Sequence, residues 1–197
     1  MTMRLSRSAH SALPWRIHQL VPDFRVEDVW ALPTPGGPDD FPRLVRLFAS
    51  ADPSGGSRGG RALWAIRWKL GRLLGWDDAD AGIGSRVSSL RDRLPPDLRD
   101  APSGPDFPAL PFTPLYLLGD EFAAEIANGT MHGVLHLGWV ADSTGGYHGQ
   151  LAVLVKPNGA VGSAYMAAIR PFRHLLVYPR MLQRIGREWR RSDDPTA

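Results

Sequence analysis

The chain has 197 residues, of which 43% are hydrophobic and 22% are charged, and this composition is typical of one folded domain with short tails. It contains no cysteine, which excludes disulfide bonds, thiolate nucleophiles and cysteine-ligated metal centres. The formal net charge is only +3, well short of the excess that nucleic-acid-binding proteins usually carry, so no nucleic-acid partner is expected.

Residues 1–20 are predicted to form a flexible, polar N-terminal tail. They carry Arg4, Arg7 and Arg16 without an acidic residue, and they lack the apolar run of roughly 7 to 15 residues that a secretion signal needs. No stretch of about 18 apolar residues occurs anywhere in the chain. We therefore expect a cytoplasmic protein without a transmembrane segment.

The front half of the chain is predicted to contain one strand and three short helices, at 23–30, 41–48, 61–74 and 87–94. The strand alternates polar and apolar residues, and each helix repeats apolar residues at a spacing of three or four. The second helix also carries Trp64 and Trp68. Glycines separate the first two helices at 51–60, and six prolines between 95 and 111 predict an extended connector.

Between residues 112 and 168 the hydrophobic period changes to two, which predicts a meander of antiparallel strands. Five strands are expected, at 112–118, 121–128, 131–140, 147–155 and 160–168. From Pro171 the helical period returns, with apolar residues on one side through Trp189. The chain is therefore predicted to end in a long helix, bent at Pro179.

Asn128 and Gly129 form the strongest short-range hairpin signal, and a two-residue turn there fixes which residues face each other. On one face Glu121 then lies opposite His136, and Glu125 opposite His132. We interpret these as solvent-exposed cross-strand pairs, with acid–base chemistry as the alternative. The two histidines lie about 13 Å apart along a strand, too far to share a metal ion. The other face is apolar and is expected to lie under the C-terminal helix.

A second pair of turn residues, Asn158 and Gly159, predicts another hairpin in which Leu151 lies opposite Met166 and Val153 opposite Ala164. Small residues then oppose large ones across the sheet. This pattern fits either close helix packing or an unfilled ligand cavity, and both interpretations remain open.

The last helix carries a line of arginines opposite its apolar side, at positions 180, 184, 187 and 191. We interpret this line as the solvated face of the helix, since cations are favourable near a helix C-terminus. Contact with phosphates or with an anionic membrane surface is the alternative. The sequence contains no familiar nucleophile motif and no phosphate-binding loop.

Several stretches of the sequence resemble a bacterial family catalogued as domain of unknown function 2867: residues 125–140, 164–179, 29–33 and 68–76. The similarity covers roughly residues 20 to 190. That family in turn resembles the helix-grip superfamily, also called START-related or SRPBCC-like. The resemblance implies a curved antiparallel sheet wrapped around a long C-terminal helix, and a small hydrophobic ligand between the two. Some members of the superfamily are cyclases or hydrolases.

The sequence and the resemblance together predict an α+β helix-grip domain over residues 21–191, with short helices in its front half and a C-terminal tail over 192–197. The predicted partner is a small hydrophobic molecule, and no cofactor or metal is expected. The residues expected to line its cavity are Trp64, Trp68, Tyr116, Phe122, Leu135, Leu137, Trp139, Met166, Arg170 and Phe172. Arg170 is the expected anchor for a carboxylate or phosphate group.

Two alternatives to simple ligand binding remain open. The first is a polyketide cyclase or aromatase, in which the same cavity orients a reactive chain while Tyr116, Tyr165 or the histidines move protons. The second is an interaction module that uses the C-terminal arginine line.

Overall fold

A computed structural model describes residues 3–51, 83, 87–128, 130–160, 162–163, 166–167, 174 and 178–192. It is an α+β fold built on one open antiparallel sheet of six strands in the order β1-β2-β6-β5-β4-β3. The strands are β1 (Met3–Arg4), β2 (Arg25–Ala31), β3 (Thr113–Leu117), β4 (Glu121–Ala127), β5 (Met131–Ala141) and β6 (Tyr147–Pro157). The helices are α1 (Arg7–Ser11), α2 (Ile17–Leu20), α3 (Phe41–Ala49), η2 (Leu90–Arg93), α5 (Pro96–Arg99) and α7 (Tyr178–Arg191).

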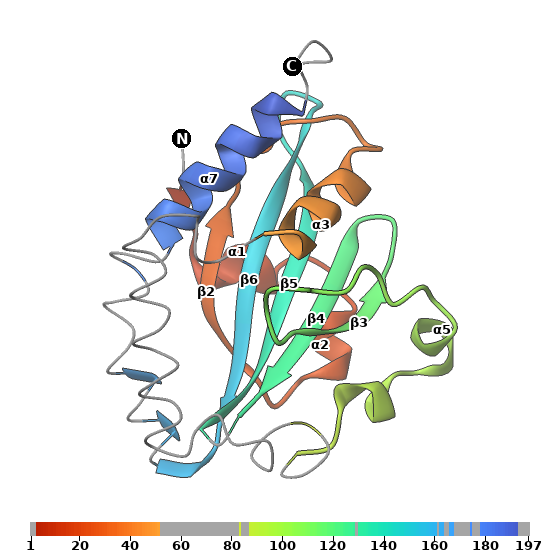
Figure 1. Cartoon of the computed structure of the whole chain (residues 1–197), viewed down its shortest axis with the longest axis vertical. Coiled ribbons are helices and arrows are strands. Elements are labelled where there is room, and N and C mark those ends of the chain that lie inside the picture. Colours follow the sequence, from red (N-terminus) through yellow and green to blue (C-terminus); the bar gives the residue numbers. More distant parts are fainter. Residues whose placement is uncertain are drawn as a thin grey trace.

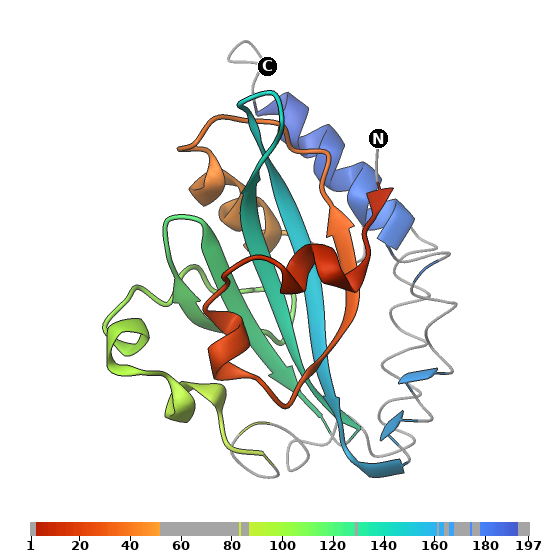
Figure 2. The same cartoon turned by 180° about the vertical axis from the view of Figure 1, so that it is seen from behind.

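Helices cover the sheet on both faces. Helices α3 and α7 lie over the face that is seen in Figure 1, which we call the front face. Helices α1 and α2 cross the opposite, back face, as Figure 2 shows. Each face has its own hydrophobic core, because alternate residues of every strand point to opposite sides of the sheet.

The front core joins aromatic and aliphatic side chains of the sheet to α3 and α7. Its largest fully buried members are Trp189, Phe41, Phe122, Leu44, Leu137 and Leu151. Gly149 allows α3 to come close to β6, since a Cβ atom there would lie only 2.5 Å from Cδ2 of Leu44. The indoles of Trp139 and Trp189 donate to the carbonyls of Gly37 and Pro35. The buried half of α7 is therefore fixed against the sheet, as the apolar period of its sequence predicts.

The back core is built largely from the N-terminal segment. Residues 3–20 form β1, α1 and α2, where we expected a flexible tail. Trp15, Ile17 and Leu20 are all buried against the sheet. Gly138 of β5 makes room for the Trp15 ring, since a Cβ atom there would lie 2.6 Å from it. The few apolar residues of this polar segment therefore decide its structure.

Most of the predicted strands and the first predicted helix are confirmed, including the meander from β3 to β6. The fifth strand, predicted at 160–168, is wrong: the described residues there, 159–160, 162–163 and 166–167, are helical. The edge of β6 that it would have joined is taken by β2. Gly162 also lies too close to the Thr130 carbonyl for an ordinary side chain, so the chain turns across the end of the hairpin.

The first hairpin is displaced by two residues from its predicted register. Glu121 lies opposite Gly138, and His136 lies opposite Ala123. The reason is the Asn128 side chain, whose Oδ1 accepts from the backbone N–H groups of Thr130 and Met131 and so builds a longer loop than a two-residue turn. A shift of two leaves every side chain on its predicted face.

No helix among the residues that the structure describes is long and apolar enough to cross a membrane.

Candidate functional site

The predicted lining residues are only partly brought together. Phe122, Leu137 and Trp139 are buried in the front core, and Leu135 is half-buried against it. Tyr116 lies on the back face instead, since a bulge in β3 between Pro114 and Tyr116 changes the alternation. Met166 is buried, in a helical segment rather than a strand. Trp64, Trp68, Arg170 and Phe172 lie outside the described residues.

A polar cluster that the sequence analysis missed lies on the front face. Its centre is Asp28, which is only 1% exposed. Tyr178 donates its hydroxyl hydrogen to Oδ2 of Asp28 at 3.0 Å, and His174 forms a very short hydrogen bond from Nε2 to Oδ1. The Arg4 guanidinium lies 3.9 Å from Oδ1. We call Asp28, His174 and Tyr178 the Asp28 cluster.

A bulge in β2 places Asp28 on this face. Val26 pairs with Leu154 and points to the back core, whereas Asp28 pairs with Val153 and Trp30 with Leu151 on the front. The extra residue between Val26 and Asp28 therefore reverses the alternation and directs a carboxylate into an apolar face. No local pattern in the sequence signals this bulge, which is why Asp28 was not predicted as a site residue.

The Trp30 ring adjoins the Asp28 cluster. The ring centroids of Trp30 and Tyr178 are 5.1 Å apart, and those of Trp30 and His174 are 6.3 Å apart. The Asp28 side chain is fully enclosed, whereas 17% of the His174 side chain is exposed. The arrangement is therefore a buried carboxylate that holds an imidazole which solvent or a ligand can still reach.

The acid–base chemistry of this pair follows from its geometry. A carboxylate accepts hydrogen bonds, so Nε2 of His174 carries a hydrogen, and in the neutral ring the basic lone pair is on Nδ1. A buried carboxylate that fixes the tautomer and orientation of an imidazole is the arrangement by which proteins prepare a histidine to take up a proton.

A second polar network lies on the back face and is centred on Glu121. Its carboxylate accepts from the backbone N–H groups of Arg16 and Ile17 at 2.8 and 2.9 Å, from the Tyr116 hydroxyl at 2.6 Å and from Nε2 of His136 at 3.1 Å. Burial alone would raise the pKa of Glu121, but these hydrogen bonds outweigh it and leave the pKa below its ordinary value. Glu121 therefore stays ionised and holds the start of α2 on the sheet.

The histidines of this network are neutral. Nδ1 of His136 lies 3.1 Å from Nε2 of His10, and both side chains are fully buried. Burial lowers the pKa of His10 to about 3, assisted by the neighbouring His136 and His18, and burial also lowers the pKa of His136. Burial raises the pKa of Tyr116, so its hydroxyl keeps its hydrogen.

Glu125 likewise holds the start of η2 on the sheet. It accepts from the backbone N–H of Leu90 at 3.0 Å, from the Ser89 hydroxyl at 2.5 Å and from Nε2 of His132 at 2.8 Å. The predicted Glu–His partners are therefore correct, but the prediction that their face is solvent-exposed is wrong. Apolar side chains of residues 15–24 and 90–98 cover it, among them Trp15, Ile17, Leu20, Phe24, Leu90 and Leu98.

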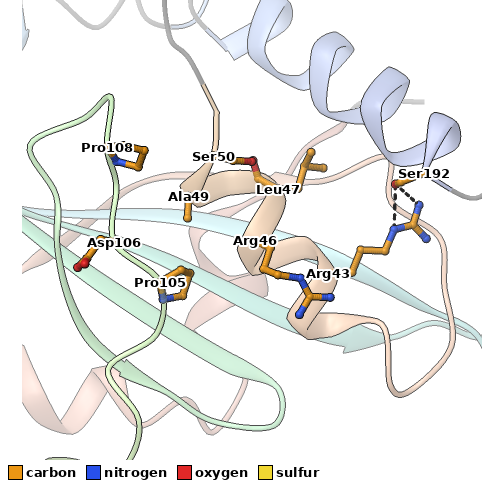
Figure 3. A pocket seen from close by; sticks show the side chains of 9 residues that line it. All are labelled: Arg43, Arg46, Leu47, Ala49, Ser50, Pro105, Asp106, Pro108 and Ser192. Carbon is orange, nitrogen blue, oxygen red and sulfur yellow. Dashed lines mark hydrogen bonds between the residues drawn. The ribbon is translucent and has the colours of Figure 1, made fainter.

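An open groove of about 510 Å³ lies apart from both networks, between α3 and the loop at 105–108 (Figure 3). It is lined by Arg43, Arg46, Leu47, Ala49, Ser50, Pro105, Asp106, Pro108 and Ser192. Figure 3 shows Arg43 turned toward Ser192, and its guanidinium also lies over the Trp189 ring at 3.8 Å from the centroid. Among the described residues, none of those predicted to line a cavity borders this groove.

The arginine line of α7 points away from the sheet. Arg180, Arg187 and Arg191 are exposed, and Arg184 bonds to Glu188 one turn later at 2.6 Å. This is the arrangement of a solvated helix face, with an exposed pair whose net contribution to stability is a few tenths of a kcal/mol.

Comparisons with known proteins locate the chain in one family. No curated protein matches it, and no solved structure matches it either. A family model described as "Protein of unknown function (DUF2867)" matches residues 20–180. This match covers most of the 197 residues, including all strands from β2 to β6 and the Asp28 cluster, so the chain belongs to the DUF2867 family.

Proposed function

We propose that this chain binds a small hydrophobic molecule on the front face, between the sheet and its C-terminal helix, with the Asp28 cluster as its polar anchor. Ligand sites of proteins are mostly apolar and contain a few converging polar groups that orient the ligand. The front face combines these two features, because Trp30 and the apolar front core adjoin Asp28, His174 and Tyr178.

The single observation that carries the proposal is the burial of Asp28. Removing a carboxylate from water costs several kcal/mol, and an apolar side chain of similar size often gives an equal or higher stability. Glu121 and Glu125 offset this cost by holding helix starts through backbone N–H groups. Asp28 instead brings the polar side chains of His174 and Tyr178 together beside the Trp30 ring. We therefore assign this carboxylate to binding.

Native mass spectrometry of the full chain, purified without added ligands, tests the proposal. We expect a bound species heavier than the chain by the mass of one small organic molecule, which is released on denaturation. The variant Asp28→Asn should lose this species, whereas Arg46→Ala, in the open groove, should keep it. A wild-type chain with no adduct and no saturable binding of an apolar fluorescent dye would overturn the proposal.

An enzyme is the second candidate, and the Asp28–His174 pair is the observation that favours it. The cyclase alternative assigned proton transfer to Tyr116 and to histidines of the hairpin. Tyr116 and His136 are enclosed by protein atoms on the back face. His174 is the histidine that joins a buried carboxylate on the front face with a partly exposed ring.

A further inference from the structure

We propose that His174 is a general base, and that its substrate is an apolar carbon acid, a molecule with an acidic C–H bond beside a carbonyl or an equivalent electron-withdrawing group. This inference rests on the proposed binding site and assigns a reaction to it. In the proposed step Nδ1 of His174 takes the proton, and the electron pair of the C–H bond forms a C=C bond as negative charge moves to the carbonyl oxygen. The imidazolium then returns the proton to the same or a neighbouring carbon, so no co-reactant is needed.

The hydrogen bond to Asp28 fixes the tautomer of His174. Asp28 accepts the Nε2 hydrogen of His174, so the lone pair is confined to Nδ1. A second acceptor oxygen of the same carboxylate is held by the Tyr178 hydroxyl at 3.0 Å, which prevents the carboxylate from rotating away. Asp28 is therefore a positioning residue, and His174 is the group that contacts the substrate.

The aromatic neighbours of His174 favour one class of substrate. Trp30 and Tyr178 flank the imidazole with their rings, at centroid distances of 6.3 and 6.0 Å. Both rings are largely buried, and an aromatic neighbourhood of this kind favours a planar or conjugated apolar molecule, because aromatic contacts add to area burial. When such a molecule covers His174, water leaves the site and the base no longer competes with solvent for its hydrogen bonds.

The remaining histidines do not offer the same chemistry. His10, His132 and His136 are buried on the back face and bonded within its networks. His18 bonds to the carbonyl of His10, and His148 lies near Asp142, a carboxylate at the turn between β5 and β6 that the backbone of the turn and Thr144 already bind. The combination of a fixed tautomer, partial exposure and an apolar neighbourhood is therefore found, among the described residues, at His174.

The probe for this activity is 5-nitrobenzisoxazole, a planar apolar carbon acid. A base takes its C3 proton, the C–H electron pair forms a nitrile, and the N–O bond breaks to release a coloured phenolate in one step. We expect the wild-type chain to accelerate this ring opening with saturation, and His174→Gln to lose about 100-fold in kcat. His148→Gln is the matched control and should keep the wild-type rate, since His148 lies at the far end of β6.

Asp28→Asn tests the positioning role with a readout that a structural role would not change. We expect KM to rise, and kcat at saturating probe to fall as well, because the loss of the carboxylate weakens binding and also releases the orientation of His174. Ring opening by His174→Gln at the wild-type rate would overturn the assignment of the base, and binding of the probe by that variant would leave the proposed binding site standing.

A second measurement does not depend on how the probe fits the site. Diethyl pyrocarbonate attacks the free nitrogen of a neutral imidazole, and peptide mapping locates the modified residue. We expect modification of His174 in the native chain and protection of His136. A native chain in which His174 stays unmodified, or a probe that binds but is not accelerated, would overturn the inference.

Discussion

Both faces of the sheet contain a buried carboxylate, but the groups that bind the two carboxylates differ. On the back face Glu121 accepts two hydrogen bonds from the backbone at the start of α2. On the front face the described donors to Asp28 are the side chains of His174, Tyr178 and Arg4. A backbone donor can leave only if its segment unfolds, whereas a side-chain donor can rotate toward a ligand. We propose on this ground that Glu121 is a folding contact and that Asp28 belongs to a binding site.

The largest expected effect comes from breaking the back-face network. Glu121→Leu removes the acceptor of two backbone N–H groups, the Tyr116 hydroxyl and His136, of which all but the Arg16 N–H are buried. We expect the free energy of unfolding to fall by about 3–5 kcal/mol. Urea denaturation followed by tryptophan fluorescence measures this loss.

A partly exposed carboxylate is the control for this experiment, since 17% of the Glu27 side chain is exposed. Glu27 pairs with the exposed Arg7 at 3.7 Å, so Glu27→Gln should cost less than about 1 kcal/mol. If Glu121→Leu is no more destabilising than Glu27→Gln, the back-face network does not hold the N-terminal segment, and the contrast between the two faces fails.

A glycine variant tests the packing of Trp15 against β5 on the back face. In Gly138→Ala the new Cβ atom would lie 2.6 Å from the Trp15 ring, a rigid group that is itself buried. We expect a loss of about 1–3 kcal/mol in unfolding free energy. Gly149→Ala makes the equivalent contact on the front face, with the end of the Leu44 side chain. Because an aliphatic methyl group shifts more easily than an indole, its cost should be smaller.

The matched control for both glycine variants is Gly119→Ala, where a Cβ atom would meet nothing within 4 Å. Thermal unfolding of the three variants side by side provides the measurement. Equal midpoints for Gly138→Ala and Gly119→Ala would show that Trp15 does not pack on β5 as described.

The back face also makes the fold sensitive to acid. The pKa of His10 falls from 6.5 to about 3 on folding, so between these pH values the unfolded chain binds a proton that the native chain does not. The stabilisation is therefore complete above about pH 6.5 and is lost as pH falls, by up to about 1.4 kcal/mol per pH unit. The groups facing His10 are His136 from β5, His18 from α2 and, more distantly, Glu121 from β4.

Unfolding by urea at a series of pH values measures this loss. His10→Leu removes one titrating group and should make the profile between pH 4 and 6 less steep, while the lowered pKa of His136 keeps part of the slope. Glu121 and Glu125 extend the same trend to lower pH, because their lowered pKa values make their stabilisation disappear as pH falls below about 4.5. A profile of His10→Leu as steep as that of the wild type would contradict the assignment.

Alternation and turn residues were enough to predict most of the sheet and the apolar face under α7. They also paired Glu121 with His136 and Glu125 with His132, because a shift of two residues preserves the faces. Which face is covered could not be predicted this way. The cover comes from residues 3–24 and 87–98, and their contacts with the sheet are long-range.

The Asp28 cluster is even harder to predict from the sequence, because its residues come from distant parts of the chain. It requires the β2 bulge, the pairing of β2 with β6 and the approach of His174 and Tyr178 from the other end of the chain. A bulge of one residue has no distinct signature in a single sequence, so alternation assigned Asp28 to no particular site. The predicted strand at 160–168 failed for a related reason, since the partner edge of β6 was already taken by a strand more than a hundred residues earlier.

The smallest expected effect on stability, and the sharpest contrast, belongs to Asp28→Asn. The amide keeps the shape of the side chain and one acceptor oxygen, and it removes a buried charge whose desolvation opposes folding. His174 and Arg4 are partly exposed and can bond to water instead. We therefore expect the free energy of unfolding, measured by urea denaturation, to fall by only about 1 kcal/mol. Glu121→Leu, which leaves four donors without their acceptor, should cost about 3–5 kcal/mol.

Stability and ligand retention, measured in the same samples, distinguish a folding role of Asp28 from a binding role. Asp28→Asn should remain folded and lose the bound small molecule, whereas Tyr178→Phe, which lacks one hydrogen bond of 3.0 Å, should lose less of both. If Asp28→Asn instead unfolds as easily as Glu121→Leu, Asp28 is a folding contact like the others. A folded variant that still holds its ligand would show that Asp28 is not the polar anchor.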